Sequence, residues 1–196
     1  MSSLERNNLY PVFFRLDKVR MLIVGAGEVG EEKMRFILKS SPDAQITMVA
    51  TWIGDDVQSI IDSREKDTPI ILREVREEDI VNHDIIVAAT NFKDVNLQVY
   101  TWAKQHGKII NVADTPDLCD FYMGSIVTRG NLKVAISTNG KSPTFSKRFR
   151  QVMESILPPE TDELLTHLEI LRDRMKGNFE EKVKKLNELT KSLINE

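Results

Sequence analysis

The chain has 196 residues, of which 41% are hydrophobic and 29% are charged, and its formal net charge is −3. This length suits one good core and a smaller appendage, at about 100–200 residues per domain. No apolar run approaches the roughly 18 residues that cross a bilayer, so we expect no membrane span. The N-terminus lacks the basic start and apolar centre of a secretory signal. We therefore expect a cytoplasmic protein.

The first half of the chain alternates short apolar runs with helical periods. Five runs are typical of strands buried on both faces of a parallel sheet, namely residues 19–24, 45–50, 69–72, 84–90 and 108–113. Apolar residues at helical spacing predict helices over residues 29–40, 53–64 and 95–106, the last closed by Gly107. This alternation predicts an α/β fold, a Rossmann-like doubly wound sheet with right-handed crossovers.

The pattern changes after residue 114. Two β-type runs, residues 125–129 and 132–137, flank the turn signal Gly130-Asn131 and predict a hairpin. Three helices should follow, over residues 143–157, 161–176 and 179–194, with leucine and valine faces that begin at Leu164 and Val183. We therefore divide the chain into a nucleotide domain (1–113), a hairpin segment (114–142) and a small C-terminal helical domain (143–196).

A glycine-rich loop follows the first predicted strand. It reads Gly25-Ala26-Gly27-Glu28-Val29-Gly30, and it closes a strand and opens a helix, which is the setting of a dinucleotide fingerprint. Gly25 allows the tight turn, Gly27 lets the backbone reach a pyrophosphate, and Gly30 permits close packing. The free N–H groups of the helix, from Glu28 and Val29 onward, would face the phosphates. A tight turn without a ligand is the alternative interpretation.

The second strand ends without the acidic residue that usually binds the adenosine ribose. Thr51 and Trp52 stand there instead, and we expect them to line the adenosine side. NAD is favoured over NADP because no positive charge lies nearby in the sequence. Ala89 and Thr90, at the end of a middle strand, leave room for the nicotinamide half, although simple packing explains them equally well.

Asp114 follows the last apolar run, where a parallel strand would deliver a carboxylate to the crevice of an open sheet. Such a carboxylate can take the proton that is lost when a hydride leaves a substrate. An ordinary turn or helix-capping aspartate is the alternative. We interpret Asp117 and Asp120 as turn and surface acids, and Cys119 as a small buried residue rather than a nucleophile or metal ligand.

Basic charge is concentrated between Phe121 and Arg150, a stretch without Asp or Glu. Its six cations are Arg129, Lys133, Lys141, Lys147, Arg148 and Arg150. Such a segment indicates an anionic ligand, and chance surface charge is the alternative. The acidic remainder of the chain opposes a nucleic-acid role. The histidines lack ligand spacing, so no resident metal is predicted.

Four linked motifs resemble the siroheme-synthase N-terminal family. They are Val24-Gly25-Ala26-Gly27-Glu28-Val29; Ala88-Ala89-Thr90-Asn91 with Asn96; Asn111-Val112-Ala113-Asp114 with Cys119 and Phe121; and Ala135-Ile136-Ser137-Thr138-Asn139-Gly140-Lys141-Ser142-Pro143. The likeness covers residues 9 to 158. Members of this family are precorrin-2 dehydrogenases, and some are also sirohydrochlorin ferrochelatases.

The resemblance implies NAD-dependent oxidation of precorrin-2, a tetrapyrrole rich in carboxylates, to sirohydrochlorin. It implies that Asp114 is the general base and serves any insertion of Fe²⁺ or Co²⁺ as substrate metal. It also implies a homodimer built through the hairpin, with substrate contacts from Arg129, Ser137, Thr138, Lys141 and Ser142. Relatives commonly have Pro where this chain has Gly124, so we expect a looser start to the hairpin.

Two other functions are compatible with the same motifs. A regulatory NAD-sensing module that binds a protein partner would need the glycine loop but neither Asp114 nor a cationic cleft. A dedicated chelatase that only retains the nucleotide loop would act on sirohydrochlorin without NAD.

Overall fold

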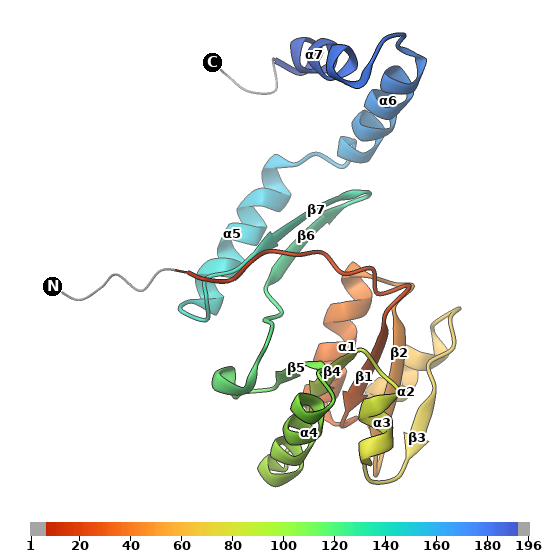
Figure 1. Ribbon diagram of the computed structural model, residues 1–196, viewed down its shortest axis with the longest axis vertical. Coiled ribbons are helices and arrows are strands. Elements are labelled where there is room, and N and C mark those ends of the chain that lie inside the picture. The colour runs from red at the N-terminus through yellow and green to blue at the C-terminus, as the bar shows by residue number, and fades with distance from the viewer. Residues whose placement is uncertain (1–6, 192–196) are drawn as a thin grey trace, which may run out of the picture. The chain divides into compact units, whose positions relative to one another are not determined.

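A computed structural model of the chain describes residues 7–191 (Figure 1). In order the elements are β1 (Arg20–Val24), α1 (Glu28–Ser40), β2 (Gln45–Ala50), α2 (Asp55–Asp62), β3 (Ile70–Leu72), α3 (Glu77–Val81), β4 (Ile85–Ala88), α4 (Lys93–Gln105), β5 (Ile109–Val112), the 3₁₀ turn η1 (Pro116–Leu118), β6 (Ser125–Arg129), β7 (Leu132–Ile136), α5 (Pro143–Ile156), α6 (Thr161–Arg174) and α7 (Phe179–Thr190). Among residues 7–191, no helix combines the length and apolar character needed to span a bilayer.

The chain divides into two compact units at the Met123–Gly124 bond. We call them the sheet unit, which ends at Met123, and the hairpin unit, which begins at Gly124. The three-part division at residues 113 and 142 stays a prediction.

The sheet unit contains a five-stranded parallel sheet with the order β3-β2-β1-β4-β5. Chain order runs outward from β1 to β3 on one side and from β4 to β5 on the other. The connection therefore reverses between β1 and β4, and ligands of open α/β sheets bind at such a reversal, beyond the carboxyl ends of the strands. The predicted doubly wound fold is confirmed.

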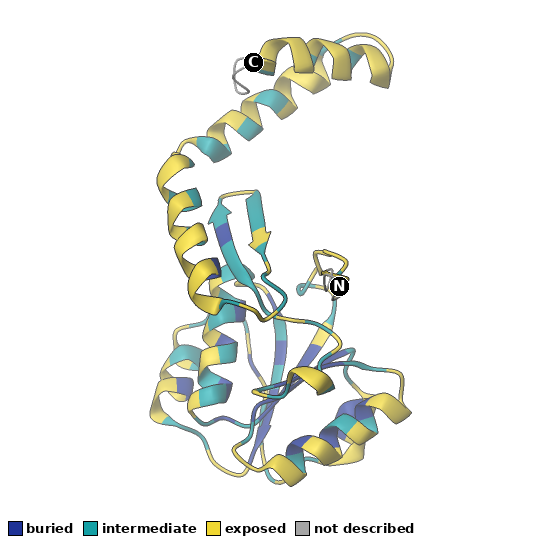
Figure 2. Ribbon diagram, turned by 90° about the vertical axis from the view of Figure 1, so that its left-hand side faces the viewer, coloured by how far each residue is buried: buried dark blue, intermediate teal, exposed yellow. Residues whose placement is uncertain are grey.

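Both faces of this sheet are covered by helices. On one face Ile23 of β1 belongs to a buried cluster with Met34 of α1 and Val57 of α2. On the other face the neighbouring Leu22 belongs to a cluster with Val99 of α4. Figure 2 shows that the strands are largely buried, whereas the outer helix surfaces are exposed. Burial on both sides explains why the strands read as continuous apolar runs.

Most element bounds fall within two residues of the sequence prediction. The exceptions are short: α3 has five residues and η1 has three, and neither was predicted. A helix of one turn shows too little apolar periodicity to be recognised. The helix predicted over 53–64 is shorter than expected, because Gly54 is its N-cap.

The hairpin unit begins with the antiparallel pair β6 and β7, which turns through Gly130 at a φ of +55°. The predicted hairpin is therefore confirmed, and α5 packs against β6. Gly124 corrects an expectation, because a Cβ at this position would collide with the carbonyl oxygen of Ile136. The glycine lets two backbone segments approach closely rather than loosening the hairpin.

The last two helices form as predicted but make no core. Among the described residues of α6 and α7 none is buried, and Leu164 and Leu171 are 41% and 43% exposed. Within residues 161–190 the apolar faces that begin at Leu164 and Val183 are therefore not buried. The predicted end of the last helix, including Leu193, lies outside the described residues.

Candidate nucleotide-binding site

The glycine turn after β1 has the geometry that its sequence predicts. Gly25 has a φ of +106°, and a Cβ on it would lie 2.6 Å from the carbonyl oxygen of Ala89. A Cβ on Gly30 would collide with the carbonyl oxygen of Gly25, so α1 packs directly on the turn. Only glycine combines this φ with this close approach. The turn is therefore built for backbone contact, as a dinucleotide requires.

The N-terminus of α1 has no side-chain cap. Its N-cap is Gly27, and the first helical hydrogen bond runs from Glu31 N–H to the Gly27 carbonyl oxygen at 2.9 Å. The first N–H groups of a helix have no partner within it, and together with the helix dipole they attract phosphate. Glu28 is exposed, Val29 is half-buried and Gly30 is buried. These three would act through backbone or packing.

A pocket of about 540 Å³ lies at the carboxyl ends of the strands. Six of the predicted cofactor residues line it, namely Gly25, Gly27, Thr51, Trp52, Ala89 and Thr90. Glu28, Val29 and Gly30 are outside its lining, as is Asp114. The glycine turn, the uncapped helix and this pocket fit a dinucleotide such as NAD: the turn admits the pyrophosphate and the pocket has room for the rest.

The far side of the pocket comes from a segment that sequence reasoning missed. Arg73, Glu74 and Val75 line it, directly after β3. The β2–β3 register places Ala50 opposite Leu72, so the next residues, Thr51 and Arg73, come from neighbouring strand ends. The only sequence signal was an apolar run that ends in an arginine. We had expected no positive charge near the adenosine side, and the position of Arg73 shows that this was wrong.

Arg73 is held by a buried carboxylate. Its Nη1 and Nη2 donate to the two oxygens of Asp79 at 2.7 and 2.8 Å, and Nη1 also donates to the Glu74 carbonyl oxygen at 2.9 Å. Asp79 is 5% exposed. Burial alone would raise its pKa, but the bonds from Arg73 and from the Arg76 N–H outweigh burial and lower it. Asp79 therefore stays ionised beside the pocket.

Asp114 lies at the end of β5 with a φ of +56°, a left-handed conformation that Asp and Asn tolerate better than most residues. Its side chain is exposed. The preceding Ala113 donates its N–H to the Ala88 carbonyl oxygen at 2.9 Å, so Asp114 follows β5 beside the Ala89–Thr90 segment of the pocket. The carboxylate has the strand-end position that was predicted, without being part of the pocket wall.

Two neighbours of Asp114 are structural. Asp120 accepts a hydrogen bond from the Ile110 N–H at 3.0 Å and pairs with Lys104 at 2.6 Å, so it ties the chain back to β5 and is more than a surface acid. The Sγ atom of Cys119 contacts the Val112 N–H at 3.3 Å, and burial raises the pKa of this thiol. A raised pKa disfavours the reactive thiolate, which supports the interpretation of Cys119 as a packing residue, although the side chain is half-buried rather than fully buried.

The five predicted substrate residues belong to the hairpin unit. Four of them lie between β7 and α5: Ser137, Thr138, Lys141 and Ser142. The Ser142 hydroxyl caps α5 by accepting from the Phe145 N–H at 3.1 Å, and Thr138 accepts from the Ser142 N–H at 3.1 Å. Arg129 instead donates to the carbonyl oxygens of Glu154 and Leu157 at 2.7 and 3.1 Å. It stabilises the C-terminal end of α5.

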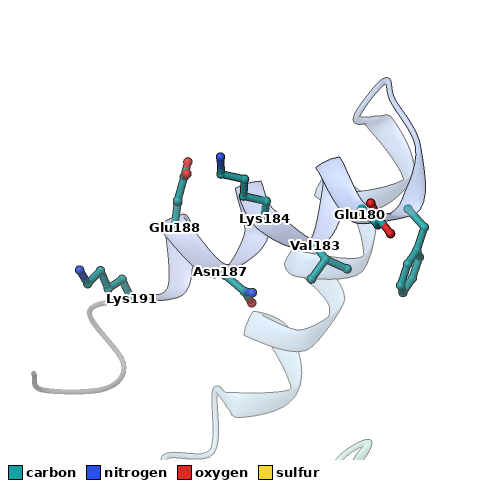
Figure 3. A pocket seen from close by; sticks show the side chains of 7 residues that line it. Glu180, Val183, Lys184, Asn187, Glu188 and Lys191 are labelled. Atoms are coloured by element: carbon teal, nitrogen blue, oxygen red, sulfur yellow. The ribbon is translucent and has the colours of Figure 1, made fainter.

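A second hollow of about 480 Å³ lies along α7 (Figure 3). Its lining comes from one face of this single helix, from Phe179 to Lys191. Figure 3 shows Lys184 and Glu188 extending outward rather than toward a common point. We assign no site to it.

Two family descriptions match consecutive parts of the chain. Residues 12–125 match the family described as "Putative NAD(P)-binding", and residues 129–156 match "Sirohaem biosynthesis protein central". The first match covers more than half of the chain. The chain belongs to this NAD(P)-binding family. The prediction of a nucleotide-binding Rossmann domain is confirmed, and so is the resemblance to the siroheme-synthase family.

Individual relatives agree. The chain is 32% identical over 170 residues to a siroheme synthase of Pseudoalteromonas atlantica, a match that covers 87% of this chain and 36% of the relative. It is 34% identical over 169 residues to siroheme synthase 3 of Aeromonas hydrophila, covering 86% and 35%. The chain thus spans about a third of these relatives. The solved structure of SirC, a precorrin-2 dehydrogenase, superposes with a TM-score of 0.72 and 26% identity, over 92% of this chain and 89% of that one.

Proposed function

We propose that the protein oxidises precorrin-2 to sirohydrochlorin with NAD as the hydride acceptor. The observation that carries this proposal is the pairing of a dinucleotide pocket in the sheet unit with a match to the siroheme-biosynthesis central family in the hairpin unit. The likeness to a precorrin-2 dehydrogenase over nearly the whole chain supports it further. An NAD-sensing module would not need a substrate-binding region of this family.

The reaction removes one hydride and one proton from the macrocycle. Bound NAD supplies the hydride acceptor. We assign the proton to Asp114, whose exposed carboxylate follows β5 beside the Ala89–Thr90 segment. A positioned general base of this kind contributes typically 10²- to 10⁴-fold to the rate. The products are then sirohydrochlorin, NADH and the proton that Asp114 releases to water.

The loop between β7 and α5 is our candidate for the substrate carboxylates. The first turn of α5 contains no acidic residue, and the exposed Lys141 lies just before its N-cap, Ser142. A helix N-terminus with a nearby lysine favours anions. Ser137 and Thr138 add hydroxyl groups in the same loop. We give Arg129 a supporting role, because its donors already bind the end of α5.

Incubation with precorrin-2 and NAD tests the activity directly. We expect stoichiometric NADH and sirohydrochlorin, and a rate no greater than the blank would refute the function.

Asp114→Asn tests the base: asparagine keeps the left-handed backbone and the side-chain shape but cannot take a proton. Turnover should fall by about 10²- to 10⁴-fold with NAD affinity retained. The neighbouring exposed Asp117→Asn is the matched control and should keep the wild-type rate.

We further propose a homodimer, and we place its contact on α5, which packs against the hairpin strand β6, rather than on the hairpin alone as the family resemblance implies. Phe145, Phe149, Val152 and Ile156 follow at spacings of four, three and four residues, and they are 59%, 42%, 52% and 61% exposed. The two phenylalanine rings stack at 6.0 Å. An apolar stripe of this kind on one helix is suited to a second copy of the same helix.

Sedimentation of the purified protein should therefore give the mass of a dimer. Val152→Glu places a charge in the stripe and should produce monomers. Gln151→Glu introduces the same charge on another face of α5 and should leave the dimer intact. Monomeric wild-type protein at micromolar concentration would exclude this interface. Insertion of Fe²⁺ or Co²⁺ and a cytoplasmic location stay predictions from the sequence.

A further inference from the structure

The usual acidic partner of an adenosine ribose is missing from the end of β2, and an arginine stands beside that place. Arg73 follows β3, lines the pocket, and is adjacent in register to Thr51. In most dinucleotide folds a carboxylate after the second strand binds the ribose hydroxyls. Here the strand next to it supplies a cation instead.

The guanidinium of Arg73 is only partly occupied. Asp79 takes the outer edge formed by Nη1 and Nη2, and the Glu74 carbonyl oxygen takes another Nη1 donor. A guanidinium has five N–H donors in a fixed fork. Among residues 7–191, Nε–H of Arg73 has no hydrogen-bond acceptor, and the nearest carboxylate oxygen to the remaining Nη2–H is the ion-paired Glu78 Oε1 at 3.6 Å. These two donors form the side edge of the fork, and such an edge suits two oxygen atoms of one ligand.

The charge around Arg73 is already balanced by carboxylates. Asp79 is buried and ionised, and Glu78 Oε1 lies 3.6 Å from Nη2. Glu78 Oε1 also lies 3.5 Å from Arg76 Nη1, so two guanidinium groups face two carboxylates. A neutral pair of hydroxyl groups can use the free donors at no electrostatic penalty, whereas a 2′-phosphate would add about two negative charges beside Glu78 and Asp79.

We propose that the side edge of Arg73 binds the adenosine ribose hydroxyls of NAD, and that Glu78 and Asp79 exclude the 2′-phosphate of NADP. Arg73 is then a binding residue, and the two carboxylates determine cofactor specificity. This inference rests on the proposed NAD-dependent function and adds the residues that select the cofactor.

Binding measurements test the inference without turnover. Trp52 and Trp102 line the pocket, so their fluorescence reports NAD and NADP titrations. Arg73→Lys keeps a cation beside Asp79 but lacks the second donor edge. We expect its affinity for NAD, titrated well below the melting temperature of the variant, to fall by roughly 10- to 100-fold, the usual effect of losing hydrogen bonds to a charged group. The loss of the paired bonds to Asp79 should lower the melting temperature as well. Wild-type affinity in this variant would overturn the role of Arg73.

Selectivity is tested at the exposed carboxylate. Glu78→Gln should raise NADP affinity relative to NAD by about three- to tenfold at low salt, and less at high salt. The control is Glu77→Gln, because Glu77 pairs with His106 at 2.7 Å instead. An unchanged ratio in Glu78→Gln would overturn the exclusion of NADP. If the wild-type protein binds neither nucleotide, the proposed function itself fails. This outcome differs from the two variant results that would overturn the inference.

Discussion

Asn96 holds Thr90 by three hydrogen bonds. Its Oδ1 accepts from the Thr90 main-chain N–H at 3.2 Å and from the Thr90 hydroxyl at 2.7 Å, and its Nδ2 donates to the Thr90 carbonyl oxygen at 2.9 Å. Asn96 is 7% exposed. One buried side chain of α4 thus fixes the loop that follows β4, and this loop forms part of the pocket.

Asn96→Ala should therefore weaken both the fold and the site. The variant leaves polar groups of Thr90 without their partner, so the free energy of unfolding should fall by about 1–3 kcal/mol. Urea unfolding curves measure this change. NAD should also bind more weakly, because the loop loses its fixed position. Thr101→Ala removes an exposed side-chain bond from the same helix, to the Leu97 carbonyl oxygen at 2.9 Å, and should change neither value appreciably. Equal behaviour of the two variants would contradict the role of Asn96.

Gly27→Ala should separate cofactor binding from folding. Gly27 has a φ of −84°, which alanine adopts readily, and its added methyl group would lie 3.3 Å from the Trp52 ring. We expect an unfolding free energy within about 1 kcal/mol of wild type. NAD affinity, measured by calorimetry, should fall at least about tenfold, because the methyl group occupies the path of the pyrophosphate. Gly54→Ala, outside the pocket lining, provides the control.

The ion pair between Arg20 and Asp84 gives the sheet unit a defined acid response. The side-chain hydrogen bond from Arg20, together with a main-chain bond from its N–H, lowers the pKa of Asp84 from 3.8 to about 2. A lowered pKa stabilises the folded state above pH 4, and this contribution is lost as the pH falls toward 2.

Asp84→Asn should accordingly be less stable than wild type at pH 7, and the difference should shrink between pH 4 and pH 2. Urea midpoints across this range measure the effect. Both side chains are about half exposed, so a small difference is expected. Asp67→Asn, an exposed position, should show no such narrowing. If the urea midpoints of wild type and Asp84→Asn differed by the same amount at all pH values, the stabilisation would not be ionic.

Gly124→Ala tests the close backbone contact at the start of β6. The new methyl group would meet the Ile136 carbonyl oxygen, and the strands would have to separate at their first pair, Ser125 and Ile136. Hydrogen exchange should accelerate for the hairpin amides and remain slow for β1. Protection of the hairpin equal to that of wild type would show that the backbone absorbs the methyl group.

Much of the sheet unit could be predicted because its strands and turns depend on residues that are close together in the sequence. Strands buried on both faces must be apolar throughout, and a turn such as Gly25 must be glycine, so both leave marks in the sequence. The position of Arg73 at the pocket leaves no such mark beyond an arginine at the end of an apolar run. It depends on which strands are neighbours and on the register of Ala50 with Leu72, and neither follows from spacing along the chain.

The hairpin unit was harder to predict from the sequence, for a different reason. Helical periodicity correctly indicated α6 and α7, but it reports which residues share a face and not whether anything covers that face. Likewise, the sequence shows how many cations lie between residues 121 and 150 but not which of them bind other groups of the protein. Arg129 binds backbone carbonyl groups and Arg150 pairs with Glu154 at 2.5 Å, and neither partnership follows from composition.

The scarcity of buried side chains after residue 123 has a thermodynamic consequence. From 124 to 191 only Val127 and Ser146 are buried, whereas the sheet unit contains every other buried residue of the described chain. So little sequestered apolar surface cannot offset the conformational entropy of nearly 70 residues. If contacts with a partner chain supply the missing stability, the stability of the hairpin unit depends on protein concentration by mass action. Its melting temperature should then rise with protein concentration, while that of the parallel sheet should stay constant.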